Sequence, residues 1–179
     1  MLKKILIAVA VVIAGFVVFV AMQPAEYTVT RSTTVAAPAA VVFTQVNDLH
    51  NWKSWSPWVK LDPAMKETFE GAPAGKGAIS SWAGNDEVGE GRMTVVDSQN
   101  AELVRIKLEF FKPFDGTSMT EFNFRPEGNG TSVTWSMSGT RGFIEKAFCL
   151  VMNGEKMIGA DFEKGLAQLK SYTETTARK

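Results

Sequence analysis

The chain has few of the residue types from which most catalytic and metal sites are built. Its 179 residues include one cysteine, Cys149, and one histidine, His50. One cysteine excludes an internal disulfide, and one cysteine with one histidine cannot supply the several ligands of an ordinary zinc site. No Gly-x-Ser-x-Gly motif is present, and a Ser-His-Asp triad would have to use His50. We therefore expect no metal, no cofactor and no catalytic residue that the sequence can identify.

The sequence also lacks an excess of charge of either sign. Lys and Arg together number 19, as do Asp and Glu. A nucleic-acid-binding surface needs clustered basic residues, so nucleic acid is not an expected partner. Residues 71–77 resemble a phosphate-binding loop, but no Ser or Thr follows Lys76 and a strand is expected next. We interpret that segment as a hairpin turn.

One long apolar run lies at the N-terminus. Residues 5–22 carry no charge and follow Lys3 and Lys4. The run is just long enough to cross a bilayer, and no small-x-small cleavage site follows it. It predicts a membrane anchor over residues 1–23, with a cleaved signal peptide as the alternative. The positive-inside rule then places the N-terminus in the cytoplasm and, in a bacterium, the domain on the periplasmic side of the inner membrane.

After a linker over residues 24–26, residues 27–176 predict one α+β domain. Turn residues separate seven segments of strand character, at about residues 26–36, 65–70, 77–83, 90–97, 102–111, 117–126 and 131–139. Apolar and charged residues alternate in several of them, which is typical of an antiparallel sheet with one wet face. A short helix is expected after Pro38. The order of elements excludes a parallel doubly wound sheet.

Two helices are expected after the last strand. Residues 143–152 are apolar on nearly all sides, which indicates either a buried helix or a gate or flap that contacts a membrane. A longer helix is predicted over residues 155–175, with Gly165 in the middle of its apolar face. Glycine there costs roughly 1 kcal/mol relative to alanine, so it indicates either close contact with the sheet or room for a ligand.

Three of the five tryptophans recur at every third position, as Trp52, Trp55 and Trp58. Each indole buries a large area and carries one N–H donor. Such a cluster either closes a core or lines the rim of an apolar cavity. Because Pro57 should break the turn before Trp58, we predict that Trp52 mainly packs the helical segments and that the other two lie nearer a cavity opening.

These features together resemble the SRPBCC or START-like superfamily, whose fold is the helix grip. Within it, the chain is similar to the polyketide cyclase/dehydrase and lipid-transport-like group. The residues that carry the resemblance are Ala37-Pro38 with Val42-Phe43, Trp52-x-x-Trp55-Ser56-Pro57-Trp58, Gly75-x-Gly77 leading to Trp82, and Phe162-Glu163-x-Gly165-Leu166-x-x-Leu169-Lys170. The resemblance implies a curved seven-stranded antiparallel sheet around a long C-terminal helix, with a deep apolar cavity between them.

Members of this superfamily bind lipids, sterols, polyketides and other hydrophobic molecules, and a minority are enzymes. The predicted cavity wall consists of Trp55, Trp58, Trp82, Met93, Phe110, Phe122, Trp135, Met137, Phe148, Phe162 and Gly165. We expect non-catalytic binding of a hydrophobic small molecule or lipid, for transport or sensing, with the membrane contacted through the N-terminal helix. The first alternative is a cyclase/dehydrase enzyme, which would need polar side chains that converge inside, such as Arg31 with Glu67 or Tyr172. The second is a protein-interaction module without a ligand.

Overall fold

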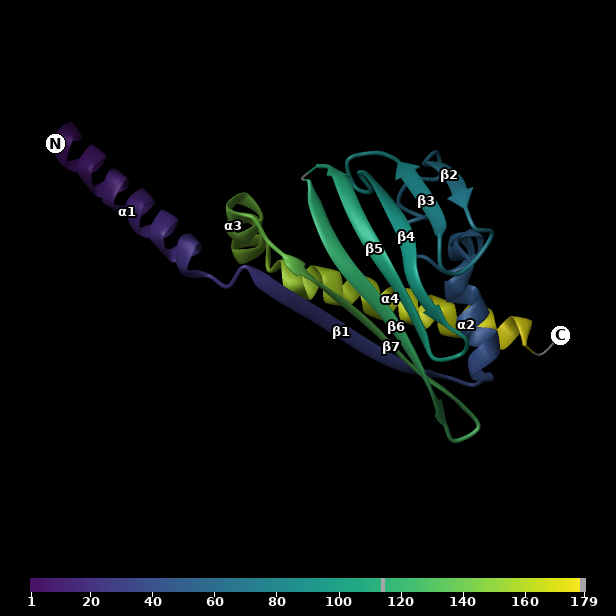
Figure 1. Ribbon diagram of the computed structural model, residues 1–179. Coiled ribbons are helices and arrows are strands. Elements are labelled where there is room, and N and C mark those ends of the chain that lie inside the picture. The colour runs from purple at the N-terminus through teal and green to yellow at the C-terminus, as the bar shows by residue number, and fades with distance from the viewer. Residues whose placement is uncertain (114, 178–179) are drawn as a thin grey trace.

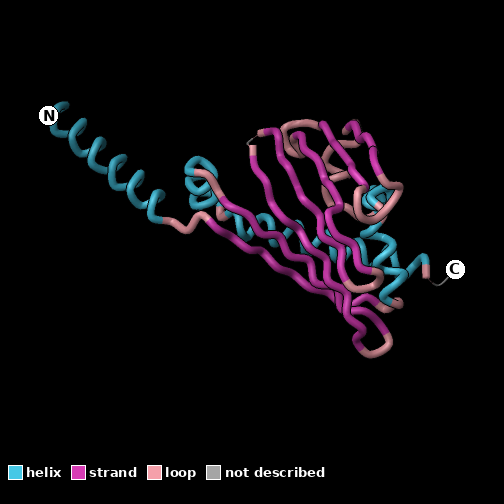
Figure 2. The backbone as a smooth tube through the Cα atoms, in the orientation of Figure 1, coloured by secondary structure: helices cyan, strands magenta, loops and turns pink. Residues whose placement is uncertain are grey.

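The computed structural model describes residues 1–113 and 115–177 (Figures 1 and 2). Its helices are α1 (Leu2–Met22), α2 (Ala39–Asn47), the 3₁₀ helix η1 (Leu49–Ser54), α3 (Phe143–Met152) and α4 (Gly154–Thr176). Its strands are β1 (Glu26–Val35), β2 (Lys66–Gly71), β3 (Ala78–Ala83), β4 (Glu90–Gln99), β5 (Leu103–Lys112), β6 (Gly116–Glu127) and β7 (Gly130–Thr140).

The seven strands form one antiparallel sheet in the order β1-β7-β6-β5-β4-β3-β2. Strands β2 to β7 pair with their neighbours in sequence, whereas β1 pairs with β7, from Glu26 opposite Thr140 to Val35 opposite Thr131. The sheet curves over α4, which runs along β1 (Figure 1). The predicted helix-grip fold, with its seven-stranded sheet and long C-terminal helix, is therefore confirmed.

Trp135 on β7 is the centre of the contact between the sheet and the helices. Its ring stacks on Phe162 of α4, with centroids 4.0 Å apart and planes 9° apart. It also stacks on Phe122 of β6 at 4.7 Å. Trp52 and Trp55 meet it edge-on at 6.2 and 6.0 Å. All five rings are buried, so this aromatic cluster ties β6, β7, α4 and the η1 segment together.

Gly165 lies on the face of α4 that meets the cluster and has no room for a side chain. A Cβ there would lie 2.8 Å from Cζ3 of Trp135 and 3.2 Å from Cδ of Pro57. Real Cβ atoms do not approach a ring carbon so closely. The glycine is therefore explained by close contact with the sheet, and the interpretation as room for a ligand is wrong.

Helix α3 is not the buried helix that its apolar sequence suggested, because none of its residues is buried. Ile144 is 62% exposed and Val151 is 70% exposed. The helix stands beside the end of α1, at the edge of the domain, and contacts both α1 and the start of α4 (Figure 1). The interpretation of residues 143–152 as a buried core helix is therefore wrong.

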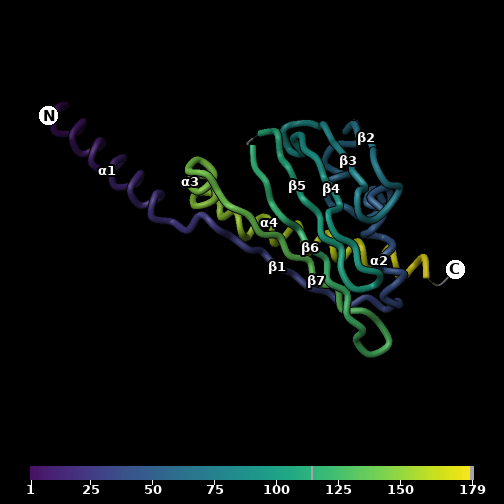
Figure 3. Tube along the Cα trace, in the orientation of Figure 1, coloured from purple at the N-terminus to yellow at the C-terminus, as the bar shows by residue number. Residues whose placement is uncertain are grey.

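Helix α1 projects away from the domain, so that the two termini lie at opposite ends of the molecule (Figure 3). It has 21 residues and is long and apolar enough to cross a membrane. Its one buried residue, Val20, lies in the last turn. Because the rest of the helix makes few contacts with the domain, the domain itself does not account for its apolar surface.

We predict that Gly165→Ala lowers the free energy of unfolding. Alanine should favour the helix by roughly 1 kcal/mol. However, its methyl group must displace a ring that is held in two stacks, and overpacking typically costs roughly 1–3 kcal/mol. Urea denaturation measures the net effect. Ala160→Gly, at an exposed position of the same helix, is the control that reports helix propensity alone. A Gly165→Ala protein more stable than the wild type would contradict the proposed packing.

Candidate functional site

A cavity of about 400 Å³ lies between the sheet and the helices. Most of its wall comes from the inner faces of β3 to β7, the segment that follows η1, and the facing sides of α3 and α4. The side chains are mainly aromatic and aliphatic. A mainly apolar wall of this kind, with a few polar groups, is typical of a site for a hydrophobic small molecule.

Eight of the eleven predicted residues lie in this wall, namely Trp58, Trp82, Met93, Phe110, Trp135, Met137, Phe148 and Phe162. The other three do not. Trp55 and Phe122 are fully buried in the aromatic cluster, and Gly165 is covered by Trp135 and Pro57. Strand alternation identifies the inner face of the sheet. It does not show which inner positions lie under a helix and which face the open space.

The tryptophan segment is arranged differently from the prediction. Trp52 packs on α2 as expected, where its Nε1 donates to the carbonyl of Val46 at 2.9 Å, but it also lines the cavity. Trp55 does not lie near an opening, because it is fully buried and its Nε1 donates to the carbonyl of Gln45 at 3.0 Å. A 3₁₀ helix has three residues per turn, so these two rings share a face and both turn inward. Trp58, which is partly exposed, lies in the wall.

Sequence reasoning missed several other wall residues. Leu108 could have been found, because it lies two residues before Phe110 on β5 and therefore faces the same side of the sheet. Val59, Met65 and Val88 come from loops, where no local pattern marks them, and Ile158 and Asp161 come from the first half of α4.

Gly91 decides how Trp82 lies in the wall. A Cβ at this position would overlap the indole of Trp82, so only glycine allows that ring to lie flat against β4. The indole Nε1 donates to the carbonyl of Val88 at 3.1 Å, which fixes its orientation. Phe110 of β5 then meets the indole edge-on, with centroids 6.0 Å apart.

Acidic side chains also stand in this mainly apolar wall, and burial shifts the pKa of two of them, Glu67 and Asp161. Burial raises the pKa of the Glu67 carboxyl above its usual value, and a hydrogen bond from Ser80 at 3.4 Å and nearby basic side chains oppose the rise. Burial also raises the pKa of Asp161, and the charge of Lys164 opposes it. Both groups are thus held in surroundings that favour the neutral acid.

A polar group lies at the end of the cavity next to α3. The guanidinium carbon of Arg141 lies 4.1 Å from the centroid of the Tyr27 ring. The Tyr27 hydroxyl is 2.8 Å from Oγ of Ser118, and burial raises its pKa. Nη2 of Arg141 is buried and has no hydrogen-bond partner. All three residues line the cavity, so this end contains a buried donor whose hydrogen-bonding capacity is unused.

The polar residues named for the enzyme alternative do not converge. Nε of Arg31 donates to Oε1 of Glu163 at 2.6 Å. Neither Arg31 nor Tyr172 belongs to the cavity wall, whereas Glu67 does. Within residues 1–113 and 115–177, no group of three or more His, Cys, Asp and Glu side chains could hold a metal ion. The acid–base pairs expected under that alternative are therefore not formed.

A curved antiparallel sheet that grips a long helix around an apolar cavity defines the helix-grip class of domain. The family model for polyketide cyclase / dehydrase and lipid transport proteins matches residues 26–174. The chain therefore belongs to this family, and the resemblance inferred from the sequence is confirmed. The family fold supports a module that binds hydrophobic ligands.

Solved structures from several bacteria share this fold. Protein CV1439 from Chromobacterium violaceum is 15% identical, with a TM-score of 0.58 over 82% of this chain and 96% of that one. Protein Ms6760 from Mycobacterium smegmatis is 17% identical, with a TM-score of 0.58 over 83% and 92%. Protein MLL2253 from Mesorhizobium loti is 21% identical, with a TM-score of 0.58 over 82% and 98%. A comparison with curated proteins finds no match.

We predict that Glu67→Gln raises the melting temperature at neutral pH. The folded-state pKa of Glu67 lies above 4.5, so ionisation in the folded state opposes folding at any pH above that raised pKa. As the pH falls through the raised pKa towards 4.5, the wild type should regain this stability and the two proteins should converge. Thermal denaturation from pH 7 to pH 4.5 checks the trend, with Glu70→Gln at an exposed position of the same strand as the control. A gap that widens towards acid pH would contradict it.

Proposed function

We propose that the protein binds a hydrophobic amphiphile, such as a lipid or a fatty acid, without changing it chemically. The observation that carries this proposal is the cavity of about 400 Å³ with its aromatic and aliphatic wall. Ligand pockets usually exceed about 300 Å³, so the size favours a binding site over an imperfectly packed core. This comparison also argues against the interaction module without a ligand.

We further propose an orientation for the bound molecule. The apolar part would lie among Trp58, Trp82 and Phe110, because these rings stand in the wall formed by β3, β5 and the segment after η1. An anionic head group would lie at Arg141, whose buried Nη2 lacks a partner. A carboxylate or phosphate oxygen there would complete a charge-assisted hydrogen bond, the stronger kind in proteins.

We also propose that the domain is anchored and does not move freely. Helix α1 would span the inner membrane of a bacterium with Lys3 and Lys4 on the cytoplasmic side, which leaves the domain on the periplasmic side. Its 21 residues correspond to about 31 Å of helix, close to the hydrocarbon thickness of a bilayer. The anchored protein would then transfer or sense its ligand at the membrane surface, and it would not carry the ligand over long distances.

We predict that Trp58→Ala weakens ligand binding more than it weakens folding. Trp58 is partly exposed and lies in the wall, so its loss removes ligand contacts and little core. Trp55→Ala is the matched control, because Trp55 is fully buried and its loss should cost roughly 3–5 kcal/mol of stability. Native mass spectrometry detects co-purified lipid, and titration with a fatty acid by tryptophan fluorescence gives the affinity. A protein that is always empty and does not respond to lipids would refute ligand binding.

A second prediction tests the head-group position. Arg141→Met should weaken the binding of a fatty acid by roughly tenfold or more, because hydrogen bonds to charged groups contribute about 1.5–3 kcal/mol. The binding of the fatty alcohol of the same chain length should change little. Isothermal titration calorimetry measures both affinities. Equal losses for the acid and the alcohol would show that Arg141 acts through packing alone.

A further inference from the structure

The outer face of α3 carries an exposed apolar stripe. Ile144 and Val151 lie two helical turns apart on this face, and they are 62% and 70% exposed. The two charged residues of the helix are engaged elsewhere. Oε2 of Glu145 accepts a hydrogen bond from the backbone N–H of Gly142 at 2.7 Å. A stripe of this kind on a short helix is unfavourable in water and is typical of contact with a protein or a membrane.

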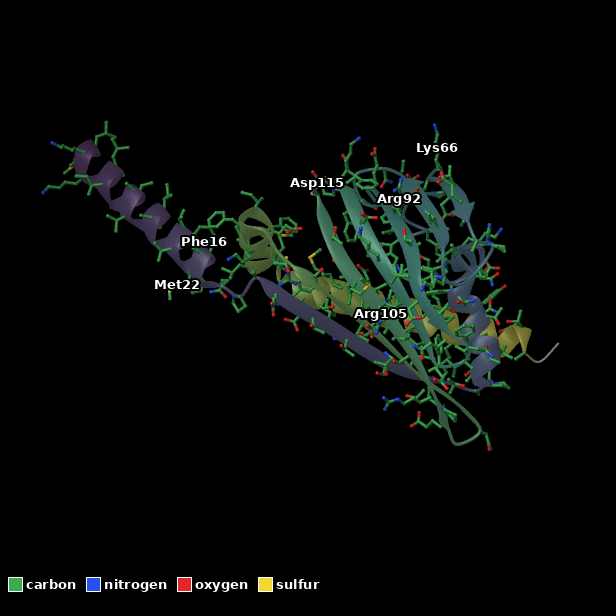
Figure 4. The ribbon with its side chains drawn as sticks, in the orientation of Figure 1. Phe16, Met22, Lys66, Arg92, Arg105 and Asp115 are labelled. Atoms are coloured by element: carbon green, nitrogen blue, oxygen red, sulfur yellow. The ribbon has the colours of Figure 1, made fainter. Side chains whose placement is uncertain are left out.

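Lys146, the other charged residue of α3, fixes the position of this helix relative to α1. Its Nζ donates to the carbonyls of Ala21 and Gln23 at 3.2 and 3.1 Å. These groups lie at the C-terminal end of α1, where helix carbonyls lack intrahelical partners and attract a cation. Figure 4 shows Phe16 on the side of α1 that faces α3. Helix α3 is thus docked on the last turns of the candidate membrane span.

The chain between α1 and the sheet allows little separation. Three residues, 23–25, connect Met22 to the start of β1, and they span at most about 10 Å. If α1 crosses a bilayer, its last turn lies at the boundary between hydrocarbon and water. The uncovered stripe of α3 must then lie at the same level, next to the head groups.

The opposite side of α3 faces the cavity. Glu145 and Cys149 belong to the wall, and so does Phe148 at the border of the two faces. A Cβ on Gly116 would lie 3.3 Å from Oε1 of Glu145, so the start of β6 closes against this helix. Helix α3 therefore lies between the cavity and the proposed membrane surface.

We propose that α3 is an interfacial helix. Its apolar stripe lies in the head-group region of the bilayer that α1 spans, and it forms the entrance through which a membrane amphiphile reaches the cavity. This inference rests on the proposed function and names the source of the ligand as the lipid leaflet itself. The stripe contacts lipid and not a second copy of the chain, because a membrane-spanning α1 would hold α3 at the bilayer surface.

The depth of α3 can be measured without any cavity ligand. The full chain with Cys149→Ala is placed one copy per nanodisc of phosphatidylcholine and phosphatidylglycerol, and a fluorophore is attached at Ile144→Cys or Val151→Cys. Thr68→Cys on the distant edge strand β2 is the control. We expect the two α3 labels to lose emission to lipids with a nitroxide near the head group and to be protected from iodide, whereas the control label shows the reverse.

Three results would overturn membrane contact by α3. Its labels could be as accessible to iodide as the label on β2. They could be shielded from both quenchers at one copy per disc, which would mean that protein covers them. Finally, protection could appear only in discs with two copies, which would make a second chain the partner.

A separate experiment tests the entrance. The double variant Ile144→Glu and Val151→Glu places charge on the stripe, and the matched control carries Thr68→Glu and Ser171→Glu at exposed positions away from it. A fluorescent fatty acid is offered in donor vesicles, and its transfer rate and its equilibrium affinity are both recorded. The rate should fall roughly tenfold or more in the stripe variant, because charge is costly in lipid, with the affinity unchanged.

An unchanged transfer rate in the stripe variant would contradict the proposal that α3 forms the entrance. If the wild type takes up no amphiphile at all, the proposed function fails and the entrance fails with it. The depth measurement does not depend on uptake, so it still decides whether α3 contacts the membrane.

Discussion

The stack of Trp135 on Phe162 is the contact on which the rest of the structure depends. It brings α4 against β7 at a distance that only Gly165 permits. On the C-terminal side of the stack, α4 is ordinary core, because Leu166 and Leu169 are fully or nearly fully buried. On the N-terminal side, Ile158 and Asp161 of the same helix form cavity wall. One aromatic pair thus divides the interior into a packed half and an open half.

The open half has a gradient of polarity along its length. Aromatic side chains from β3 and β5 line one part, whereas Arg141 and Tyr27 stand near α3 and the end of α1. A buried guanidinium nitrogen without a partner is costly in a site that holds no ligand. An anionic group would remove that cost, and under the proposed orientation it would enter from the side of α1 and α3. The apolar exterior of α3 and the charged end of the cavity therefore have one common explanation.

Much of the fold could be predicted, because its determinants are local. Turn residues and strand-forming composition located all seven strands, and alternation of apolar and charged residues identified the inner face of several. The apolar run at the N-terminus and the helices were equally visible. The errors arose where position depends on neighbours that are distant in sequence. Trp55 and Trp52 look alike in the sequence, but only the packing of η1 under α2 decides that Trp55 is buried and Trp52 reaches the cavity.

The sequence by itself determined the elements, their order and the inner face of each strand, because period and turn chemistry act over a few residues. It also determined that an apolar interior would form. Only the tertiary structure decided which inner residues are core and which are cavity wall, since that depends on which inner positions the helices cover. Only the tertiary structure places Lys146 at the end of α1, which is more than a hundred residues away in the sequence. Through that contact an apolar helix, which in isolation resembles core, lies exposed beside the end of α1.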